Sequence, residues 1–109
     1  MKQDIVYALL DSTGLPREED YAVPINGIAK KLPYIVVRTK ETIEGDDLGK
    51  IQIQKTEWIV ALFTTNREDA LEQTLRKALS PVGRVEITRY PDGKPYQTNF
   101  EFTTKQLMK

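Results

Sequence analysis

Residues 51–63 change their hydropathy pattern halfway, and this change constrains the fold more than any other feature of the chain. The first half alternates between isoleucine and glutamine, whereas residues 58–63 are apolar throughout. Alternation is typical of a strand with one solvent-facing side, and a continuous apolar run is typical of a strand covered on both sides. We therefore expect one end of this strand to lie in a core and the other to extend toward solvent or a partner.

The preceding strand-like stretch, residues 34–43, shows the same division, because it is apolar at its start and mixed at its end. The polar segment 44–49 separates the two stretches, which are predicted to pair as a hairpin over residues 34–63. In this pairing the apolar halves lie together in the core and the polar halves lie together near the loop. The two strands thus predict a protruding β-hairpin arm, with Trp58 at the junction between core and arm.

Two further segments, residues 3–12 and 66–79, have the periodicity of amphipathic helices. Gly14 follows the first segment as a stop signal. The second segment begins within a capping-box sequence, in which Thr65 is expected to cap the helix start and Glu68 lies three residues later. The sequence therefore predicts two helices, the second with a side-chain cap at its start.

The second helix is predicted to bury one stripe and to expose the opposite side. Glu72 and Arg76 are spaced i,i+4, and we expect them to form an ion pair on the exposed side. The buried stripe is predicted to consist of Leu71, Leu75, Ala78 and Leu79.

Residues 84–104 predict a second hairpin, with its turn at residues 91–95. The last strand of this hairpin alternates in polarity, so we expect one face in the core and one in solvent. Residues 106–109 are expected to form a frayed tail. The segment 14–33 is interrupted by glycine and proline, and we expect an extended connection with one short strand near residues 21–25.

These elements predict one α+β domain that covers residues 1–109. The order is helix, strand, strand, helix, strand, strand. We expect a four- to five-stranded, mostly antiparallel sheet with two helices on one face and the β-hairpin arm protruding from it.

Composition excludes several kinds of chemistry. The chain has no cysteine and no histidine, which excludes disulfides and zinc–thiolate sites and removes the commonest general base. We therefore expect no cofactor and no enzymatic activity; a small carboxylate enzyme is the least favoured alternative and would need two carboxyls facing each other in a cleft. Neither a secretory signal nor an apolar run near the ~20 residues of a membrane span is found, so we expect a soluble protein made in a cytoplasm.

The arm carries charges of both signs. Sixteen basic residues balance sixteen acidic ones over the chain, and the basic cluster around Arg38 and Lys40 is followed at once by acidic residues. Because this cancellation weakens attraction to phosphates, we do not expect sequence-specific nucleic-acid binding. Alternating patches instead favour contact between subunits. The loop around Asp46 and Asp47 lacks the ligand spacing of a calcium loop and is interpreted as a solvated hairpin tip.

Five short motifs follow one another along the chain. They are the N-terminal helix with Tyr7 and Leu10, the strand opening from Leu32 to Val37, the strand from Trp58 to Thr64, the acidic-start helix from Glu68 to Leu79, and the closing strand from Tyr96 to Phe102. The order of these motifs resembles that of a family of small tailed-phage and prophage proteins, the tail-completion or head–tail joining proteins, also described as tail terminators. The resemblance extends over nearly the full length. In the hairpin loop, where the family usually has Ala-Asp or Asp-Asn, this chain has Gly45-Asp46-Asp47.

The resemblance implies a non-enzymatic virion structural protein of a bacteriophage or prophage. Such a protein forms a homo-oligomeric ring, usually of six copies, that terminates the tail tube and docks it to the neck. The implied partners are other copies of the chain, tail-tube proteins and head–neck connector proteins. No membrane binding is implied. The implied location is the tail or neck of the virion, after assembly from the host cytoplasm. The alternative is a monomeric protein- or peptide-binding module that uses a sheet edge.

The predicted subunit contacts lie on the hairpin arm. Trp58 is either a core residue, which we favour, or a buried interface anchor. The predicted interface residues are Arg38, Lys40, Glu44, Asp46, Asp47, Gln52, Gln54, Lys55 and Trp58.

Overall fold

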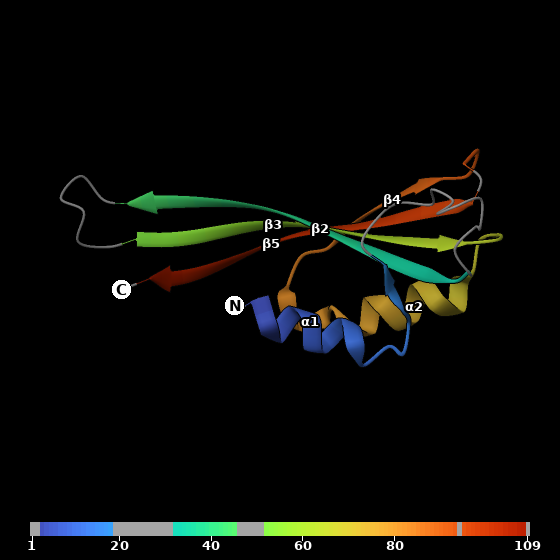
Figure 1. Cartoon of the computed structure of the whole chain (residues 1–109), viewed down its shortest axis with the longest axis horizontal. Coiled ribbons are helices and arrows are strands. Elements are labelled where there is room, and N and C mark those ends of the chain that lie inside the picture. Colours follow the sequence, from blue (N-terminus) through green and yellow to red (C-terminus); the bar gives the residue numbers. More distant parts are fainter. Residues whose placement is uncertain (1–2, 19–31, 46–51, 94, 109) are drawn as a thin grey trace.

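The computed structural model describes residues 3–18, 32–45, 52–93 and 95–108. Two helices lie on one face of a twisted sheet, and three long strands extend well beyond the helices (Figure 1). The molecule is elongated, with extents of 51 × 31 × 24 Å. The predicted α+β class, with two helices on one face of the sheet, is confirmed.

The sheet has the strand order β1-β2-β3-β5-β4, with antiparallel pairing everywhere except between β1 and β2. The element order confirms the prediction except for β1, which the sequence did not indicate. The short strand expected near residues 21–25 lies outside the described residues. The elements are α1 (Gln3–Asp11), β1 (Arg17–Glu18), β2 (Tyr34–Gly45), β3 (Gln52–Thr64), α2 (Asp69–Ala78), the 3-10 helix η1 (Ser80–Val82), β4 (Glu86–Tyr90) and β5 (Tyr96–Met108).

The apolar half of β3 lies between two clusters, as its pattern predicted. We call the side of the sheet on which α1 and α2 lie the helix face and the opposite side the far face. On the far face, Tyr34 and Val36 of β2 pack against Ala61 and Phe63 of β3. The main core lies on the helix face and contains Val6, Leu10, Ile35, Trp58, Val60, Leu62, Leu75, Leu79, Phe100 and Phe102.

Helix α1 is amphipathic in the way its sequence predicts. Val6 and Leu10 are spaced i,i+4 and are fully buried against the sheet, which stabilises the fold by about 1.5–3 kcal/mol for each side chain. The helix ends at Asp11, and Gly14 follows with a φ of 75°. Glycine adopts this left-handed conformation at little cost, so the chain can turn back toward β1.

Helix α2 begins later than predicted, and the capping box is not formed. The N-cap residue is Glu68, and its side chain makes no capping hydrogen bond. Strand β3 continues to Thr64, which still pairs with Tyr96 of β5. The Thr64 hydroxyl donates to the carbonyl of Asn66 at 2.5 Å. Because the bend after β3 takes up residues 65–67, Thr65 lies too far from the first turn to cap it.

The prediction of a frayed tail at residues 106–109 is wrong for its described part. Strand β5 extends to Met108 and pairs with β3 along its whole length, from Thr64↔Tyr96 to Gln52↔Met108. The main-chain hydrogen bonds of the second edge of β3 hold this segment in the sheet. The protrusion is therefore three-stranded, and the predicted two-stranded hairpin is only part of it.

We call the part of these strands beyond the paired residues Thr39, Trp58 and Phe102 the arm. It consists of residues 40–45 of β2, 52–57 of β3 and 103–108 of β5. Strand β3 is central, and β2 and β5 flank it, so β2 and β5 are parallel to each other.

Candidate functional site

The base of the arm is a packed aromatic cluster around Trp58. The indole N–H of Trp58 donates to the hydroxyl of Thr104 at 2.9 Å, and its ring stacks on Phe102 with centroids 5.8 Å apart. Tyr7 of α1 packs edge-on against the same ring at 5.4 Å. Trp58 is 1% exposed, so its side chain lies in the core of the subunit and is not available on the surface as an interface anchor. The cluster fixes the direction in which the arm leaves the domain.

The helix face of the arm is polar. Thr56 and Thr104 lie just beyond the aromatic cluster, and Gln54 and Gln106 form the next paired row. At the start of α1, the Gln3 amide donates to the Glu41 carboxylate, so the helix touches the arm. Ile43 is the exception, a large apolar side chain that is 59% exposed.

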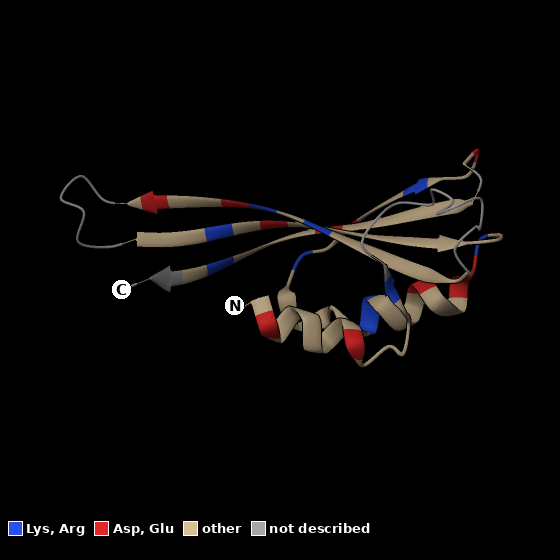
Figure 2. Cartoon of the chain, viewed as in Figure 1, with Lys and Arg blue, Asp and Glu red and all other residues tan. Residues whose placement is uncertain are grey.

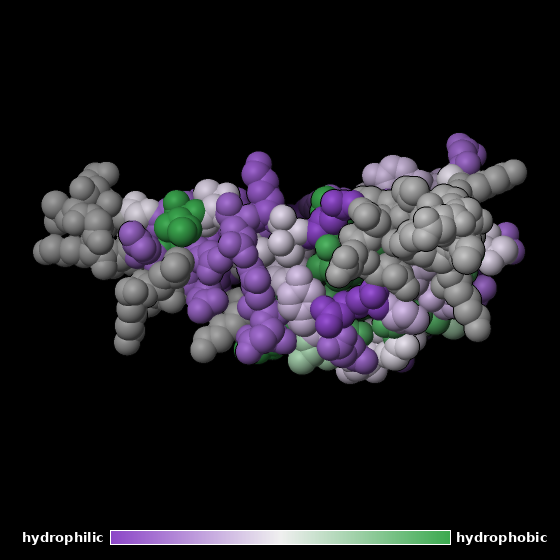
Figure 3. Space-filling model, viewed as in Figure 1, coloured by the Kyte–Doolittle hydropathy of each residue, from purple (hydrophilic) through white to green (hydrophobic). Residues whose placement is uncertain are grey.

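The far face of the arm carries alternating charges. Lys40 pairs across the strands with Glu57, which in turn pairs with Thr103. Lys55 and Glu57 form an ion pair within β3 at 4.0 Å. Positive and negative segments alternate along the arm strands (Figure 2), and the exposed side chains there are mainly hydrophilic (Figure 3). The described side chains of the arm therefore form no apolar face of the kind that drives obligate association.

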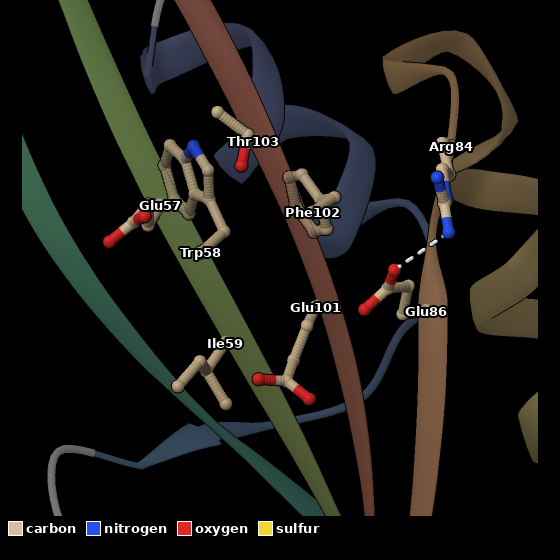
Figure 4. A pocket seen from close by; sticks show the side chains of 8 residues that line it. All are labelled: Glu57, Trp58, Ile59, Arg84, Glu86, Glu101, Phe102 and Thr103. Atoms are coloured by element: carbon tan, nitrogen blue, oxygen red, sulfur yellow. Dashed lines mark ion pairs between the residues drawn. The ribbon is translucent and has the colours of Figure 1, made fainter.

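A hollow of about 490 Å³ lies on the far face at the base of the arm, where β4 begins. Glu57 of β3, Glu101 of β5 and Glu86 of β4 surround it, with Ile59 at its side (Figure 4). Arg84 forms an ion pair with Glu86 at 3.0 Å. Three carboxylates and one guanidinium therefore line the hollow, and two of the carboxylates, those of Glu57 and Glu86, form ion pairs with Lys55 and Arg84.

Both flanking strands of the arm have long outer edges without a neighbouring strand among the described residues. Strand β4 pairs with β5 only as far as Glu101, so no described strand lies beside β5 from Phe102 to Met108 on that side. Strand β1 pairs with β2 only at Ile35 and Val36. No described strand therefore lies beside residues 39–45 of β2 on its outer side. A strand edge without a neighbouring strand can pair with another chain.

The structure places the predicted interface residues of β2 on the far face. Arg38, Lys40 and Glu44 are all exposed, and their strand is one of the two flanking strands of the arm. Asp46 and Asp47 lie outside the described residues.

The predicted residues of β3 are placed differently. Gln52 and Gln54 lie on the helix face, Lys55 lies on the far face, and all three are on the central strand, whose backbone is paired on both sides. They can offer side chains to a partner but no free edge. Sequence reasoning missed the contribution of β5 to the arm, because residues 103–106 are all polar and show no alternation that would indicate a strand.

A second misjudged feature is the ion pair of Glu72. The predicted pairing with Arg76 on the exposed side is wrong, because Glu72 is 3% exposed and faces β4. Its Oε1 accepts hydrogen bonds from the Nε and terminal nitrogen of Arg89, at 3.0 and 2.7 Å. These bonds raise the pKa of the Arg89 guanidinium above its ordinary value. Arg67 lies 3.7 Å from the other carboxylate oxygen. This cluster fastens α2 to the sheet.

No group of three or more Asp or Glu side chains with the geometry of a metal site occurs among the described residues. Within those residues, no helix is both long and apolar enough to cross a bilayer. No family model matches the chain, and no curated protein matches it with significant similarity.

Proposed function

We propose that this protein is a non-enzymatic assembly subunit that uses its three-stranded arm to contact neighbouring copies. The observation that supports this most directly is the arm itself, a three-stranded sheet that extends from a well-packed core and whose outer strands have no further neighbouring strand among the described residues. An isolated domain gains little from ordering such strands in water, because most of the arm residues bury little apolar surface. Contact with another chain gives these outer strands hydrogen-bond partners.

The polar composition of the arm suits a subunit that must stay dispersed before it assembles. Charged residues on edge strands, such as Lys40 and Glu44, oppose indiscriminate edge-to-edge aggregation. The same charges favour partners that present a complementary pattern. The arm can therefore offer backbone hydrogen bonds to a partner, and its charged side chains restrict which partners can bind.

We further propose that the assembly is a ring, with six copies as the expected number, at the junction of head and tail in a tailed phage or prophage particle. This part rests on the resemblance of the motif order to tail-completion proteins. In this role the ring terminates the tail tube and binds head–neck connector proteins. The protein then resides in the virion after assembly from the host cytoplasm, and it binds neither membrane nor a specific nucleic-acid sequence.

A monomeric module that captures an extended peptide is the second candidate. The outer edge of β5 supports it, because a peptide added there gains main-chain hydrogen bonds over a stretch from Phe102 to Met108. This candidate predicts binding at one edge and no self-association.

Sedimentation velocity over a wide concentration range separates the two candidates, and negative-stain electron microscopy of the assembled fraction identifies closed rings. Immunogold labelling of induced phage particles from the host strain then tests the location. The proposal predicts rings and label at the head–tail junction. A protein that stays monomeric at every concentration, with particles that carry no label, would contradict it.

A further inference from the structure

Strand β4 forms an outer edge of the five-stranded sheet, and this edge lies outside the arm (Figure 1). One side of β4 pairs with residues 97–101 of β5. No described strand lies beside its other side. Strand β4 also contains no lysine and no proline, two residues that commonly block pairing at a sheet edge. A further strand can therefore add to the sheet at β4.

The turn after β4 indicates which residues direct their backbone groups outward. The carbonyl of Tyr90 accepts a hydrogen bond from the amide of Gly93 at 3.3 Å, so this carbonyl points into the hairpin that β4 and β5 form. Backbone directions alternate along a strand, so Thr88 also turns its N–H and C=O groups toward β5. The N–H and C=O groups of Ile87 and Arg89 therefore point to the outer edge.

This edge is complementary to itself about a two-fold axis at Thr88. In an antiparallel pair with a second copy, Ile87 of one copy lies opposite Arg89 of the other, and the two residues exchange two backbone hydrogen bonds. The axis generates this pair twice. Between the two pairs, the Thr88 side chains of both copies face each other, and threonine pairs are favourable in this position. Tyr90, which is 46% exposed, lies opposite Glu86 of the other copy and is partly covered.

Charge favours this register. An axis at Glu86 or at Arg89 would place two like charges directly opposite each other, which is destabilising. With the axis at Thr88, two further residues at each end bring Arg84 of one copy toward Asp92 of the other. The Arg84 side chain is 87% exposed, and Asp92 is exposed as well. Opposite charges therefore meet at both ends of the contact.

Helix α2 is positioned to extend the same contact. Its Glu72 accepts hydrogen bonds from Arg89 of β4, and its apolar side packs in the core to which β5 contributes. Strands are about 4.8 Å apart, so a helix above β4 and β5 lies about 10 Å from its copy across the axis, a usual distance between packed helices. The two helices are antiparallel there. The first turn of one, with Asp69, lies beside the last turn of the other, with Arg76 and Lys77.

From these observations we infer that two copies of the chain join by antiparallel pairing of their β4 strands about a two-fold axis at Thr88. The pairing makes one continuous sheet from the sheets of both copies, with their α2 helices side by side. A contact of this kind is self-complementary and closes at two copies. The inference goes beyond the proposed function, because the contact uses the edge at β4 and leaves the arm available to other copies.

Cysteine cross-linking tests the position of the axis directly, because the chain has no cysteine. In the inferred contact, the Cα atoms of the two Thr88 residues are about 4.5 Å apart, within the range of a disulfide. Thr88→Cys is therefore expected to give a covalent dimer on a non-reducing gel under mild oxidation. The absence of this dimer would overturn the inference.

Glu86→Cys and Tyr90→Cys are the matched controls, on the same strand and the same face as Thr88. Each of these two residues lies four positions from its own counterpart across the axis, about 14 Å along the strand, so neither variant alone is expected to cross-link. A mixture of the two variants is expected to give a dimer, because Glu86 of one copy lies opposite Tyr90 of the other. A dimer from Glu86→Cys alone would contradict the register.

Charge reversal supplies a second, independent measurement. Arg84→Asp and Asp92→Arg are each expected to weaken dimerisation about tenfold in sedimentation velocity, because each change places like charges at both ends of the contact. Their combination is expected to restore most of the affinity. Lys40→Glu, on the arm, is the control and is expected to leave dimerisation unchanged. Circular dichroism confirms that each variant is folded.

The outcomes separate this inference from the proposed function. Closed rings without the Thr88→Cys cross-link, and without sensitivity to Arg84→Asp, would overturn the pairing of β4 and leave the assembly function standing. A Thr88→Cys dimer in a protein that forms no closed rings would support the pairing of β4 and contradict the proposed ring.

Discussion

Replacing Arg89 by methionine is expected to destabilise the fold far more than replacing Arg76 in the same way. The Glu72 carboxylate is nearly buried and accepts two hydrogen bonds from Arg89, at 3.0 and 2.7 Å. Breaking a buried ion pair on one side costs about 3–5 kcal/mol. Two facts reduce this cost, because the Arg89 side chain is 35% exposed to screening water and Arg67 stays 3.7 Å from Glu72. We therefore expect a loss of about 2 kcal/mol.

Urea denaturation at neutral pH measures this loss, and thermal denaturation should show a decrease in Tm of about 8 °C for a domain of this size. The pKa of Arg89 is raised in the folded protein, so the stabilising contribution of its ion pair with Glu72 is fully present below the ordinary arginine pKa. This contribution is lost only as the pH rises above that value, and it is therefore complete at neutral pH.

Arg76→Met is the matched control, since Arg76 is exposed, and it should change stability by less than about 0.5 kcal/mol. Replacing both Glu72 and Arg89 by apolar residues should recover most of the lost stability, because no buried charge then remains unpaired. Equal effects of Arg89→Met and Arg76→Met on the free energy of unfolding would refute the reasoning.

Three further predictions concern other parts of the fold. Thr104→Val leaves the buried indole N–H of Trp58 without its acceptor and should cost about 1–2 kcal/mol, measured by urea denaturation, whereas a neutral effect would mean that water replaces the hydroxyl. Gly14→Ala forces a side chain into a φ of 75° and should cost about 1 kcal/mol in the same assay; since no atom crowds the site, an unchanged stability would show that the backbone relaxes. Deleting residues 106–109 removes the partners of Gln52 to Gln54, so hydrogen exchange of those amides should accelerate severalfold, and unchanged rates would argue that this end of β5 contributes no pairing.

The sequence predicted the hairpin well because its pattern is set by burial on both faces of β3. Ala61 and Phe63 on one face and Val60 and Leu62 on the other occupy two different clusters, so the apolar run had one simple explanation. The arm segment of β5 has no comparable apolar run, because it is not buried on both faces. Polar residues after Phe102 fit a strand edge and a solvated tail equally well, and only the pairing with β3 distinguishes them.

The environment of Glu72 shows a different limit of sequence reasoning. Glu72 shares a helical face with Leu75 and Leu79, at spacings of three and seven residues, so its burial was compatible with the pattern. Arg76, at the i,i+4 position, offered a local ion-pair partner for Glu72, and nothing in the sequence indicated another. Arg89 lies seventeen positions away, and its contact with Glu72 depends on how α2 packs on β4.

The placement of β3 between β2 and β5 also has a consequence for folding. The pairing of β3 with β2 is local in sequence, but its pairing with β5 joins residues as distant as Gln52 and Met108. Distant pairing forms more slowly, because the entropy of loop closure must be overcome first. Until β5 docks, the apolar end of β3 has an unoccupied side that β5 of another chain fits equally well. At high concentration, strand exchange between chains therefore competes with correct folding, and dilute refolding should favour the native monomer.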